Sequence, residues 1–326
     1  MEQAQIVIES HLDGAAPRTL ADDVRDGLTR PFKELPPKHF YDQRGAELFD
    51  LICELPEYYP TRTERAILER RAGDIAAATG AAELVELGAG SASKTRVLIE
   101  PLLAAGTLVR YVPIDVTESV VRSTAAQLAE EYPTLQVHGV IADFERHLDR
   151  LPPPAGPRLV AFLGGTIGNF TPPSRRTFLR ELAGLLGPED HLLIGTDLVK
   201  DRARLRAAYD DSRGVTAEFN RNVLAVINRE LGADFDLADF EHVALFDEER
   251  QWIEMRLRAR REVVVHIRDL DLEARFAAGE EMRTEISAKF TPERVQRDLA
   301  GAGLEVASWM PDPDGLYALT LARPAG

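Results

Sequence analysis

Between residues 83 and 197 the chain alternates short apolar runs with amphipathic stretches, and no other feature of the sequence constrains its fold as strongly. The apolar runs are ELVEL, LVRYVPID, LQVHGVIAD, RLVAFLGG and HLLIGTD. The stretches between them that predict helices are 94–105, 117–131 and 173–186. Strand–helix alternation is typical of a parallel sheet with helices on both faces, and strands that are apolar throughout are typical of a sheet buried on both sides. We therefore predict a doubly wound α/β sheet in this region.

The pattern changes after residue 198. Residues 199–231 predict a helix, and residues 241–270 carry long alternating runs that predict an antiparallel meander. Residues 292–300 predict a last helix. It is followed by LEVASWM, the turn PDPDG and LYALTLA, which predict a hairpin.

These changes predict a chain that is split between two domains. The doubly wound sheet occupies 63–198 and resumes at 289–326 with its last helix and hairpin, whereas 199–288 forms an inserted unit. We expect residues 1–62 to pack with the insert, because they offer only short helices and the proline-broken loop RPFKELPPKHFYD.

The chain is acidic, with 54 acidic against 39 basic residues and a formal net charge of -15. Such a surface repels a nucleic-acid backbone or an anionic membrane, so neither is an expected partner. Four arginines, Arg256, Arg258, Arg260 and Arg261, do cluster in a predicted strand. They lie among glutamates, which favours a solvated strand face over a binding patch.

The single cysteine, Cys53, excludes an internal disulfide and fits a cytosolic protein. It lies in the apolar stretch LFDLICEL, which favours core packing over a nucleophilic role. The first residues, MEQAQIVIESHLDG, lack the basic and apolar segments of a secretory signal, and no apolar run approaches the ~20 residues of a membrane span. We expect a cytoplasmic, monomeric protein that acts on a small molecule.

A glycine turn, LGAGSASK, follows the first predicted strand and leads into a helix. Gly88 and Gly90 let the backbone approach a ligand, and the helix start supplies free N–H groups. A dinucleotide site needs G-x-G-x-x-G. Ser93 stands at the third glycine position, which disfavours NAD.

Acidic residues follow the next two predicted strands. Asp115 ends LVRYVPID and could accept hydrogen bonds from both hydroxyls of a ribose. Asp143 could accept from an adenine amino group, with Phe144 as its aromatic neighbour. Each carboxylate alone is equally compatible with a helix cap. Three such elements at successive strand ends favour an adenosine ligand at the carboxyl edge of the sheet.

S-adenosylmethionine is the preferred adenosine ligand, because the third glycine is missing and the antiparallel hairpin resembles the ending of class I methyltransferases. Lys94 could pair with the methionyl carboxylate, although a solvated surface lysine is an equally good interpretation. The loop FLGGTIGNF after the fourth strand would lie beside the transferable methyl, where the Asn169 amide could hold an acceptor amine or carboxylate. The alternative is a glycine-rich turn in which Asn169 tolerates a left-handed conformation.

Longer strings run through most of the chain. They are LPPKHFYD (35–42), LPEYYPTRTE (55–64), ELGAGSASKT (86–95), FLGGTIGNFTP (162–172), GTDLVKD (195–201), AYDDSRGVTAEFNRNVLAVINREL (208–231) and AGEEMRTEISAKF (278–290). Together they resemble the L-histidine Nα-methyltransferases of ergothioneine biosynthesis, from about residue 20 to the final hairpin. The resemblance implies a Rossmann-like class I methyltransferase sheet with a terminal antiparallel hairpin, which binds S-adenosylmethionine, and an inserted α+β domain that binds the substrate.

The resemblance also implies which residues bind the two small molecules. Those that would hold S-adenosylmethionine are Gly88, Lys94, Asp115, Asp143 and Phe144. Tyr58, Asn169 and Tyr209 would hold the α-amino and carboxylate end of L-histidine. Asn169 and Tyr41 would act beside the reacting amine.

The imidazole ring would be clamped by Glu285 and Ser287, with Met255 lining the pocket. A carboxylate and a hydroxyl two residues apart in an extended segment face the same side, so they could grip both ring nitrogens. Without the resemblance, TEIS reads as an ordinary amphipathic stretch.

The implied reaction is S-adenosylmethionine-dependent trimethylation of the α-amino group of L-histidine to hercynine, the first step of ergothioneine biosynthesis, without a metal. A sulfonium is already an excellent leaving group, so the protein mainly aligns the reactants, and the amine proton leaves to water or through a tyrosine. Alternatives are N-methylation of another amino acid such as tryptophan, an NAD-dependent oxidoreductase, and a non-catalytic adenosine-binding sensor. Glu285 and Ser287 disfavour tryptophan, because an indole offers only one donor.

Overall fold

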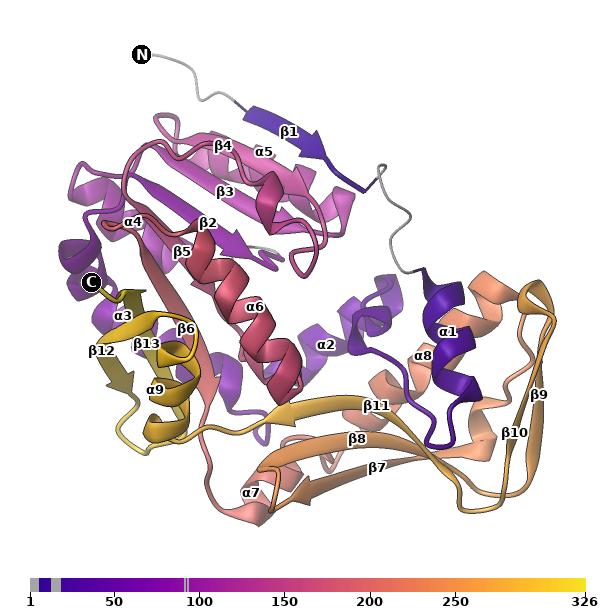
Figure 1. Cartoon of the computed structure of the whole chain (residues 1–326). Helices are drawn as coiled ribbons and strands as arrows, with labels where there is room; N and C mark the ends of the chain where they lie inside the picture. The colour runs from indigo at the N-terminus through magenta and orange to yellow at the C-terminus, as the bar shows by residue number, and fades with distance from the viewer. Residues whose placement is uncertain (1–5, 13–18, 91, 93) are drawn as a thin grey trace. The chain divides into compact units, whose positions relative to one another are not determined.

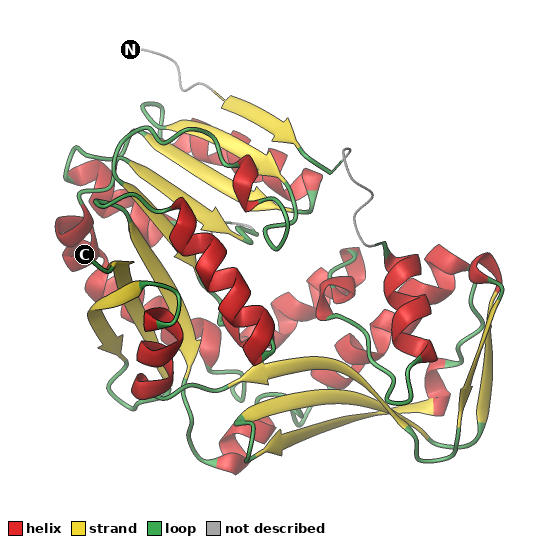
Figure 2. Cartoon of the chain, viewed as in Figure 1, coloured by secondary structure: helices red, strands yellow, loops and turns green. Residues whose placement is uncertain are grey.

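The computed structural model describes residues 6–12, 19–90, 92 and 94–326. The strands are β1 (Ile6–Ser10), β2 (Glu83–Leu87), β3 (Arg110–Asp115), β4 (Gln136–Ile141), β5 (Arg158–Phe162), β6 (His191–Asp197), β7 (Phe240–Asp247), β8 (Trp252–Ala259), β9 (Val263–Ile267), β10 (Leu272–Phe276), β11 (Glu281–Ala288), β12 (Leu304–Pro311) and β13 (Tyr317–Pro324). The α-helices are α1 (Leu20–Thr29), α2 (Gln43–Glu54), α3 (Pro60–Thr79), α4 (Arg96–Ala104), α5 (Glu118–Glu131), α6 (Pro172–Leu185), α7 (Arg202–Ala207), α8 (Val215–Leu231) and α9 (Pro292–Ala300). Figures 1 and 2 show these elements.

The chain folds into two compact units, which we describe one at a time. Of the described residues, the first unit contains 6–12, 62–198 and 290–326, and the second contains 19–61 and 199–289. The chain therefore passes from one unit to the other between residues 12 and 19 and near residues 61, 198 and 289. None of the helices in the described part of the chain is long and apolar enough to cross a membrane.

The first unit is built on one mixed sheet with the strand order β1-β4-β3-β2-β5-β6-β13-β12. The strands from β1 to β6 in this order are parallel to one another. β13 pairs antiparallel with β6, and β12 pairs antiparallel with β13. The predicted doubly wound sheet with a terminal antiparallel hairpin is confirmed, and its order reverses next to β2, where open α/β sheets bind ligands.

Helices cover both faces of this sheet, because alternate residues of each strand point to opposite sides. Leu159 of β5 lies in a buried core with side chains of α3, α4 and α5. On the other face, Phe162 of β5 packs against Phe178 of α6, with ring centroids 5.1 Å apart. Figure 1 shows α6 in front of the strands of this sheet.

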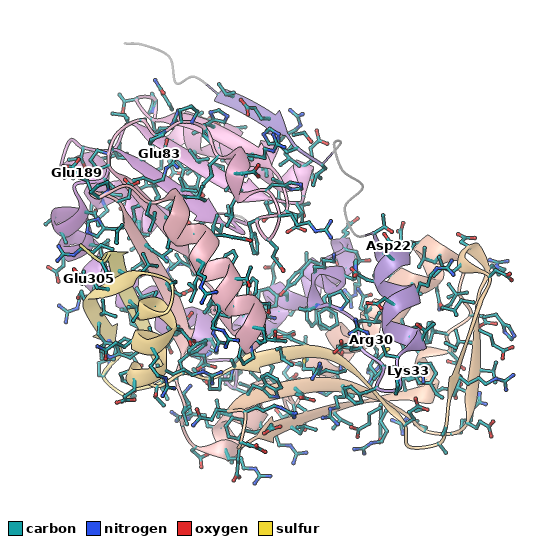
Figure 3. The ribbon with its side chains drawn as sticks, viewed as in Figure 1. Asp22, Arg30, Lys33, Glu83, Glu189 and Glu305 are labelled. Atoms are coloured by element: carbon teal, nitrogen blue, oxygen red, sulfur yellow. The ribbon has the colours of Figure 1, made fainter. Side chains whose placement is uncertain are left out.

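A buried carboxylate at the start of β2 has a structural role. Glu83 (labelled in Figure 3) is fully buried and pairs with Arg110 and with Arg158, whose Nε lies 2.5 Å from Glu83 Oε1. Buried charges persist where partners neutralise them, and both arginines follow in neighbouring strands. This ion pair lies at the amino ends of the strands.

The second unit combines helices with antiparallel strands. β7, β8 and β11 form one sheet in the order β11-β8-β7, and β9 pairs with β10 in a separate ribbon. α8 packs against β7 and β8, and α2 packs against α8. The predicted meander is therefore divided between two sheets, because the long run WIEMRLRARREVVVHI breaks between Ala259 and Val263.

Two expectations were wrong in detail. We expected residues 1–62 to pack together with the insert, but β1 pairs in parallel with β4 at the edge of the large sheet. The segment 199–231 is not one helix, because α7 and α8 are separated by a loop. Asp211 in this loop accepts hydrogen bonds from the N–H groups of Val215 and Thr216, and Gly214 adopts a left-handed conformation with φ 72°. Such a cap starts a new helix.

Candidate active site

The glycine turn of the first unit adopts the backbone conformation that its composition predicts. Gly88 and Gly90 have φ values of 69° and 50°, in the left-handed region that side chains disfavour. The N–H of Gly88 donates to the carbonyl of Ile114, which joins the turn to the end of β3. Ser91 and Ser93, and with them the departure at the third glycine position, lie outside the described residues.

Asp115 at the end of β3 holds the same turn from the side. One carboxylate oxygen accepts from the N–H of Gly90 at 3.2 Å, and the other accepts from the N–H of Thr117 at 2.9 Å. Thr117 precedes α5, so the helix-cap interpretation of Asp115 describes one of its contacts. Each carboxylate oxygen can accept more than one hydrogen bond, so the group retains capacity for ribose hydroxyls.

Asp143 and Phe144 follow β4. The Asp143 carboxylate accepts from the N–H of Glu145 at 2.9 Å, as a helix cap would. The Phe144 ring packs edge-on against Phe162, with centroids 5.4 Å apart. Its edge would lie 3.5 Å from a Cβ at Gly88, so the structure brings Phe144 next to the glycine turn. Gly88, Asp115 and Phe144 are thus grouped as predicted, around the carboxyl ends of β2, β3 and β4.

Lys94 forms an ion pair within the protein. Its Nζ lies 2.5 Å from Oε2 of Glu64, a carboxylate on α3 that is fully buried. Glu64 also accepts from the N–H of Gly164 at 2.8 Å and from the hydroxyl of Tyr317 at 2.7 Å. The sequence analysis missed Glu64, because a glutamate in an amphipathic helix carries no signal of its tertiary partners. A cofactor carboxylate would have to share Lys94 with Glu64.

The loop that carries Asn169 is fixed at its start. Gly164 and Gly165 adopt left-handed conformations, with φ values of 79° and 71°, and a 3₁₀ helix follows at Thr166–Asn169. Asn169 itself has no positive φ, so the interpretation of Asn169 as a left-handed turn residue is wrong. Its half-buried side chain is therefore not explained by a turn requirement.

Strands β8 and β11 of the second unit bring together the residues predicted to hold an imidazole. Glu285 pairs directly with Met255 across the ladder, and Ser287 pairs with Ile253. Residues opposite each other in an antiparallel pair share a face, and so do residues two apart in a strand. Glu285, Ser287 and Met255 therefore lie on one face of the sheet. A bulge between Arg283 and Glu285 sets this register.

Tyr209, which follows α7, joins this face through its hydroxyl, which donates to Ser287 Oγ at 2.8 Å. The tyrosine backbone is held in turn by His242, whose Nε2 lies 2.8 Å from the Tyr209 carbonyl oxygen. The Asn220 amide lies 2.8 Å from Nδ1 of the same ring. Burial lowers the pKa of His242, so the ring is neutral and donates through Nε2. The sequence analysis missed His242 and Asn220, since both act through another residue.

Aromatic rings connect the remaining predicted residues of the second unit. Tyr41 packs edge-on against Phe49, with centroids 5.5 Å apart. Phe49 contacts Tyr58 at 6.1 Å, and Tyr58 contacts Tyr209 at 6.3 Å. Such a row of ring faces and hydroxyls suits an ammonium or carboxylate ligand. Phe49 was not predicted, because one phenylalanine in an apolar helix reads as core.

The hydroxyls of Tyr41 and Tyr58 are poor proton acceptors. Withdrawal from water raises the pKa of each, and the nearby Glu285 carboxylate raises both further by repulsion. The Tyr41 side chain is 48% exposed, and the Glu285 carboxylate lies near enough to raise the pKa of its hydroxyl. Both side chains stay protonated near neutral pH and donate hydrogen bonds, which disfavours a tyrosinate as the base for an amine proton.

The clustered arginines behave as a strand face of paired charges. Arg256 pairs with Glu281 at 2.5 Å, and Arg258 pairs with Glu281 at 2.6 Å and with Glu241 at 3.2 Å. Carboxylates on β7 and β11 therefore neutralise them, in agreement with the solvated-face interpretation.

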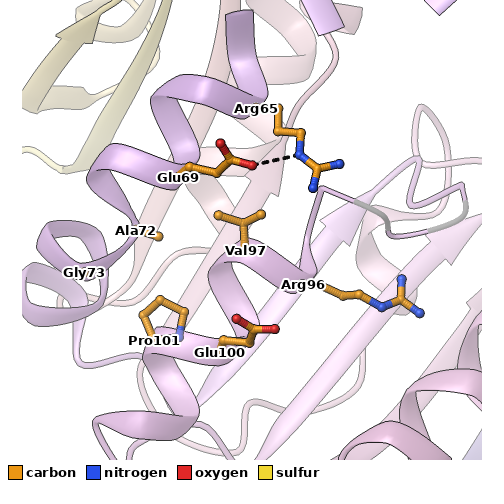
Figure 4. A pocket seen from close by; sticks show the side chains of 8 residues that line it. All are labelled: Arg65, Glu69, Ala72, Gly73, Arg96, Val97, Glu100 and Pro101. Carbon is orange, nitrogen blue, oxygen red and sulfur yellow. Dashed lines mark hydrogen bonds and ion pairs between the residues drawn. The ribbon is translucent and has the colours of Figure 1, made fainter. Parts of the chain in front are cut away.

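A surface pocket of the first unit lies elsewhere, between α3 and α4 (Figure 4). Its lining residues are Arg65, Glu69, Ala72, Gly73, Arg96, Val97, Glu100 and Pro101. Arg65 and Glu69 pair with each other at 2.9 Å across its rim. None of the predicted site residues lines this pocket.

Comparison with known proteins places the chain among methyltransferases. Residues 20–324 match a family described as histidine-specific methyltransferase, SAM-dependent. The chain is 55% identical over 308 residues to the histidine N-alpha-methyltransferase of Mycolicibacterium smegmatis, covering 94% of this chain and 96% of that protein. It is 51% identical over 319 residues to that of Mycobacterium tuberculosis, covering 98% and 99%. It is 31% identical over 300 residues to ergothioneine biosynthesis protein 1 of Neurospora crassa, covering 89% of this chain and 33% of that protein.

Proposed function

The chain belongs to the family of histidine-specific, S-adenosylmethionine-dependent methyltransferases, and from that premise we propose that it trimethylates the α-amino nitrogen of L-histidine to hercynine in ergothioneine biosynthesis. Its first unit has the Rossmann-like fold of class I methyltransferases. The observation that carries the proposal for the substrate is the shared face of Met255, Glu285 and Ser287 on β8 and β11. That face combines a carboxylate and a hydroxyl, the kinds of group that could meet the two nitrogens of an imidazole.

The residues at the ends of β2, β3 and β4 fit an adenosyl ligand. The left-handed Gly88 and Gly90 leave the backbone open to close approach, and Asp115 offers acceptor capacity beside them. When bound, S-adenosylmethionine supplies a methyl group on a positively charged sulfur that needs no further activation. Gly88, Asp115, Asp143 and Phe144 would hold its adenosine half.

Lys94 is proposed to meet the carboxylate of the same ligand. Because it already pairs with Glu64, binding would draw the Lys94 charge between two carboxylates. Glu64 keeps the N–H of Gly164 and the hydroxyl of Tyr317 as partners, so it would not be left without hydrogen bonds.

The substrate residues are proposed to align a neutral amine. Tyr58, Tyr209 and Asn169 would hold the amino and carboxylate groups, and Tyr41 would donate beside the amine. Because the Tyr41 and Tyr58 hydroxyls stay protonated, the amine proton leaves to water. The contribution of the protein is then alignment and exclusion of competing water.

Incubation of the purified protein with S-adenosylmethionine and L-histidine tests the proposal. Mass spectrometry is expected to show three successive methyl additions to histidine and none to tryptophan offered in parallel. S-adenosylhomocysteine in place of the methyl donor is the control and should give no product. Methylation of tryptophan but not histidine would favour the other amino-acid substrates, and binding of both molecules without transfer would favour a sensor.

Other sequence-based expectations remain predictions. We propose that the protein acts in the cytoplasm as a monomer, and that it uses neither a metal, a nucleic acid nor a membrane. The methylation assay does not report the oligomeric state, so size-exclusion chromatography with light scattering measures it.

A further inference from the structure

The face of β11 that carries Glu285 and Ser287 continues to a third polar residue, Lys289. Its backbone N–H donates to the carbonyl of Gln251 at 2.7 Å, which extends the ladder with β8. Residues at positions i, i+2 and i+4 of a strand share a face, so Lys289 points to the same side as the other two. Its side chain is fully buried.

Lys289, Tyr209 and Ser287 form a closed triangle of hydrogen bonds. The Lys289 Nζ donates to Ser287 Oγ at 2.9 Å and to Tyr209 Oη at 3.0 Å. The Tyr209 hydroxyl donates to Ser287 Oγ at 2.8 Å. The lysine nitrogen also lies 4.6 Å from the centre of the Tyr209 ring, which helps to hold the two side chains together.

In this triangle the serine accepts from both of its partners. A serine hydroxyl has one hydrogen to donate and two lone pairs to accept with. Among the described residues its side-chain partners are Lys289 and Tyr209, and both donate to it. Its lone pairs are therefore used, and the hydroxyl hydrogen is what it offers to a ligand.

We propose that Lys289 is a positioning residue that makes Ser287 a donor toward the ligand, and thereby selects a ring with an acceptor nitrogen. The neighbouring Glu285 carboxylate accepts only, so the two residues together would recognise a ring with one acceptor nitrogen and one N–H. A neutral imidazole has this pattern, whereas an indole and a pyrrole have only the donor. This inference rests on the proposed histidine substrate and assigns the form of the ring that is bound.

Loss of Lys289 releases this constraint. Tyr209 Oη then no longer accepts from the lysine ammonium and accepts more readily from Ser287, so the Tyr209–Ser287 hydrogen bond can reverse. In the reversed bond the serine hydrogen points to Tyr209 and is lost to the ligand. A ligand acceptor that faced this hydrogen would lose its partner, whereas a ligand without an acceptor would lose nothing there.

The test compares three ligands by calorimetry in the presence of S-adenosylhomocysteine. They are L-histidine, thiazolylalanine, which keeps an acceptor nitrogen but lacks the N–H, and pyrrolylalanine, which keeps an N–H but lacks the acceptor. Lys289→Met, which keeps the chain length, is expected to weaken histidine and thiazolylalanine binding by about tenfold, the lower part of the range for an unpaired buried group. Pyrrolylalanine should lose less affinity than the other two, because only its contacts with Tyr209 at the amino-acid end can change.

Two further variants keep the test decisive. In a Ser287→Ala background, Lys289→Met should cause no additional loss of histidine affinity, because the lysine acts through the serine. Lys289→Gln, whose amide can still donate to Ser287, should lose less histidine affinity than Lys289→Met. It also keeps the test possible where the methionine variant does not fold. Lys200→Met is the matched control, since Lys200 donates to Tyr59 Oη at 2.7 Å and lies over that ring but is not a partner of Ser287.

An equal loss for all three ligands would overturn the inference, because Lys289 would then only preserve the shape of the site. An additional loss in the Ser287→Ala background would overturn it as well. Wild-type protein that binds no histidine would instead count against the proposed function, so the two failures are distinguishable.

Discussion

At the scale of single residues, Glu285 carries the negative charge on the shared face of β8 and β11. Glu285→Ala is expected to weaken histidine binding by about 1.5–3 kcal/mol, the range for a hydrogen bond to a charged group. Calorimetry with S-adenosylhomocysteine present measures the affinity. Glu249→Ala, which removes an exposed carboxylate from the turn between β7 and β8, is the matched control and should bind histidine normally. Unchanged affinity in the Glu285 variant would remove Glu285 from the site.

Glu86 on β2 makes stability depend on pH. Burial raises its pKa to about 7, although the hydroxyls of Thr95 and Tyr111 both donate to it. In the unfolded chain the pKa of a glutamate is about 4.5, so the folded protein holds this proton more tightly than the unfolded one. The resulting stabilisation is fully present below about pH 4.5 and is lost as the pH rises through about 7.

Glu86→Gln, which mimics the protonated acid, should therefore gain stability over the wild type as the pH rises. We expect a relative gain of about 1–3 kcal/mol between about pH 5 and about pH 8.5, measured by urea unfolding at both values. Glu130→Gln, at an exposed position of α5, should show no such dependence on pH. If Glu86→Gln changes the free energy of unfolding by the same amount at both pH values, the raised pKa of Glu86 is contradicted.

At the scale of elements, Gly195 shows how β6 accommodates the buried Glu64. A Cβ at Gly195 would lie 2.1 Å from Glu64 Oε1 and 2.5 Å from Tyr317 Oη, and neither buried group has room to move aside. Gly195→Ala is expected to destabilise the protein by about 1–3 kcal/mol, the cost of overpacking. Thermal unfolding measures this. Gly184→Ala is the control, since a Cβ there, in α6, meets no atom within 4 Å, and alanine favours a helix. A stable Gly195→Ala protein would contradict the packing around Glu64.

The sequence predicted the elements of the large sheet because their signals are local. Apolar runs and glycine turns located β2 to β6, and α9 was predicted within its observed bounds. β1 was missed because a strand of this length at a sheet edge, IVIES, does not stand out from an irregular segment. The break before α8 depends on Asp211 and on the conformation of Gly214, which composition alone did not separate from a continuous helix.

At the scale of the whole chain, the predicted and missed site residues differ in how they act. Gly88, Asp115 and Glu285 lie at strand ends or on a strand face. For these residues both the side-chain type and the position in the strand pattern can be seen in the sequence. Glu64 and Lys289 act on other side chains that the fold brings near, and Glu64 lies 253 positions from Tyr317. A single sequence contains no local signal for such partners, so the predictions named the groups proposed to touch ligands and omitted those that hold them.

The inserted segment 199–289 begins and ends at neighbouring points beside the large sheet. Leu198 and Phe290 are parallel bridge partners, and the N–H of Phe290 donates to the carbonyl of Asp197 at 2.8 Å. The entropic cost of holding two chain ends together grows only slowly with the length of chain between them. The pairing of β6 with β13 joins residues that all lie outside 199–289, so we expect changes of length within that segment to leave the pairing in place. If the second unit binds the substrate, as we propose, members of the family could differ in substrate while they keep the same methyl donor.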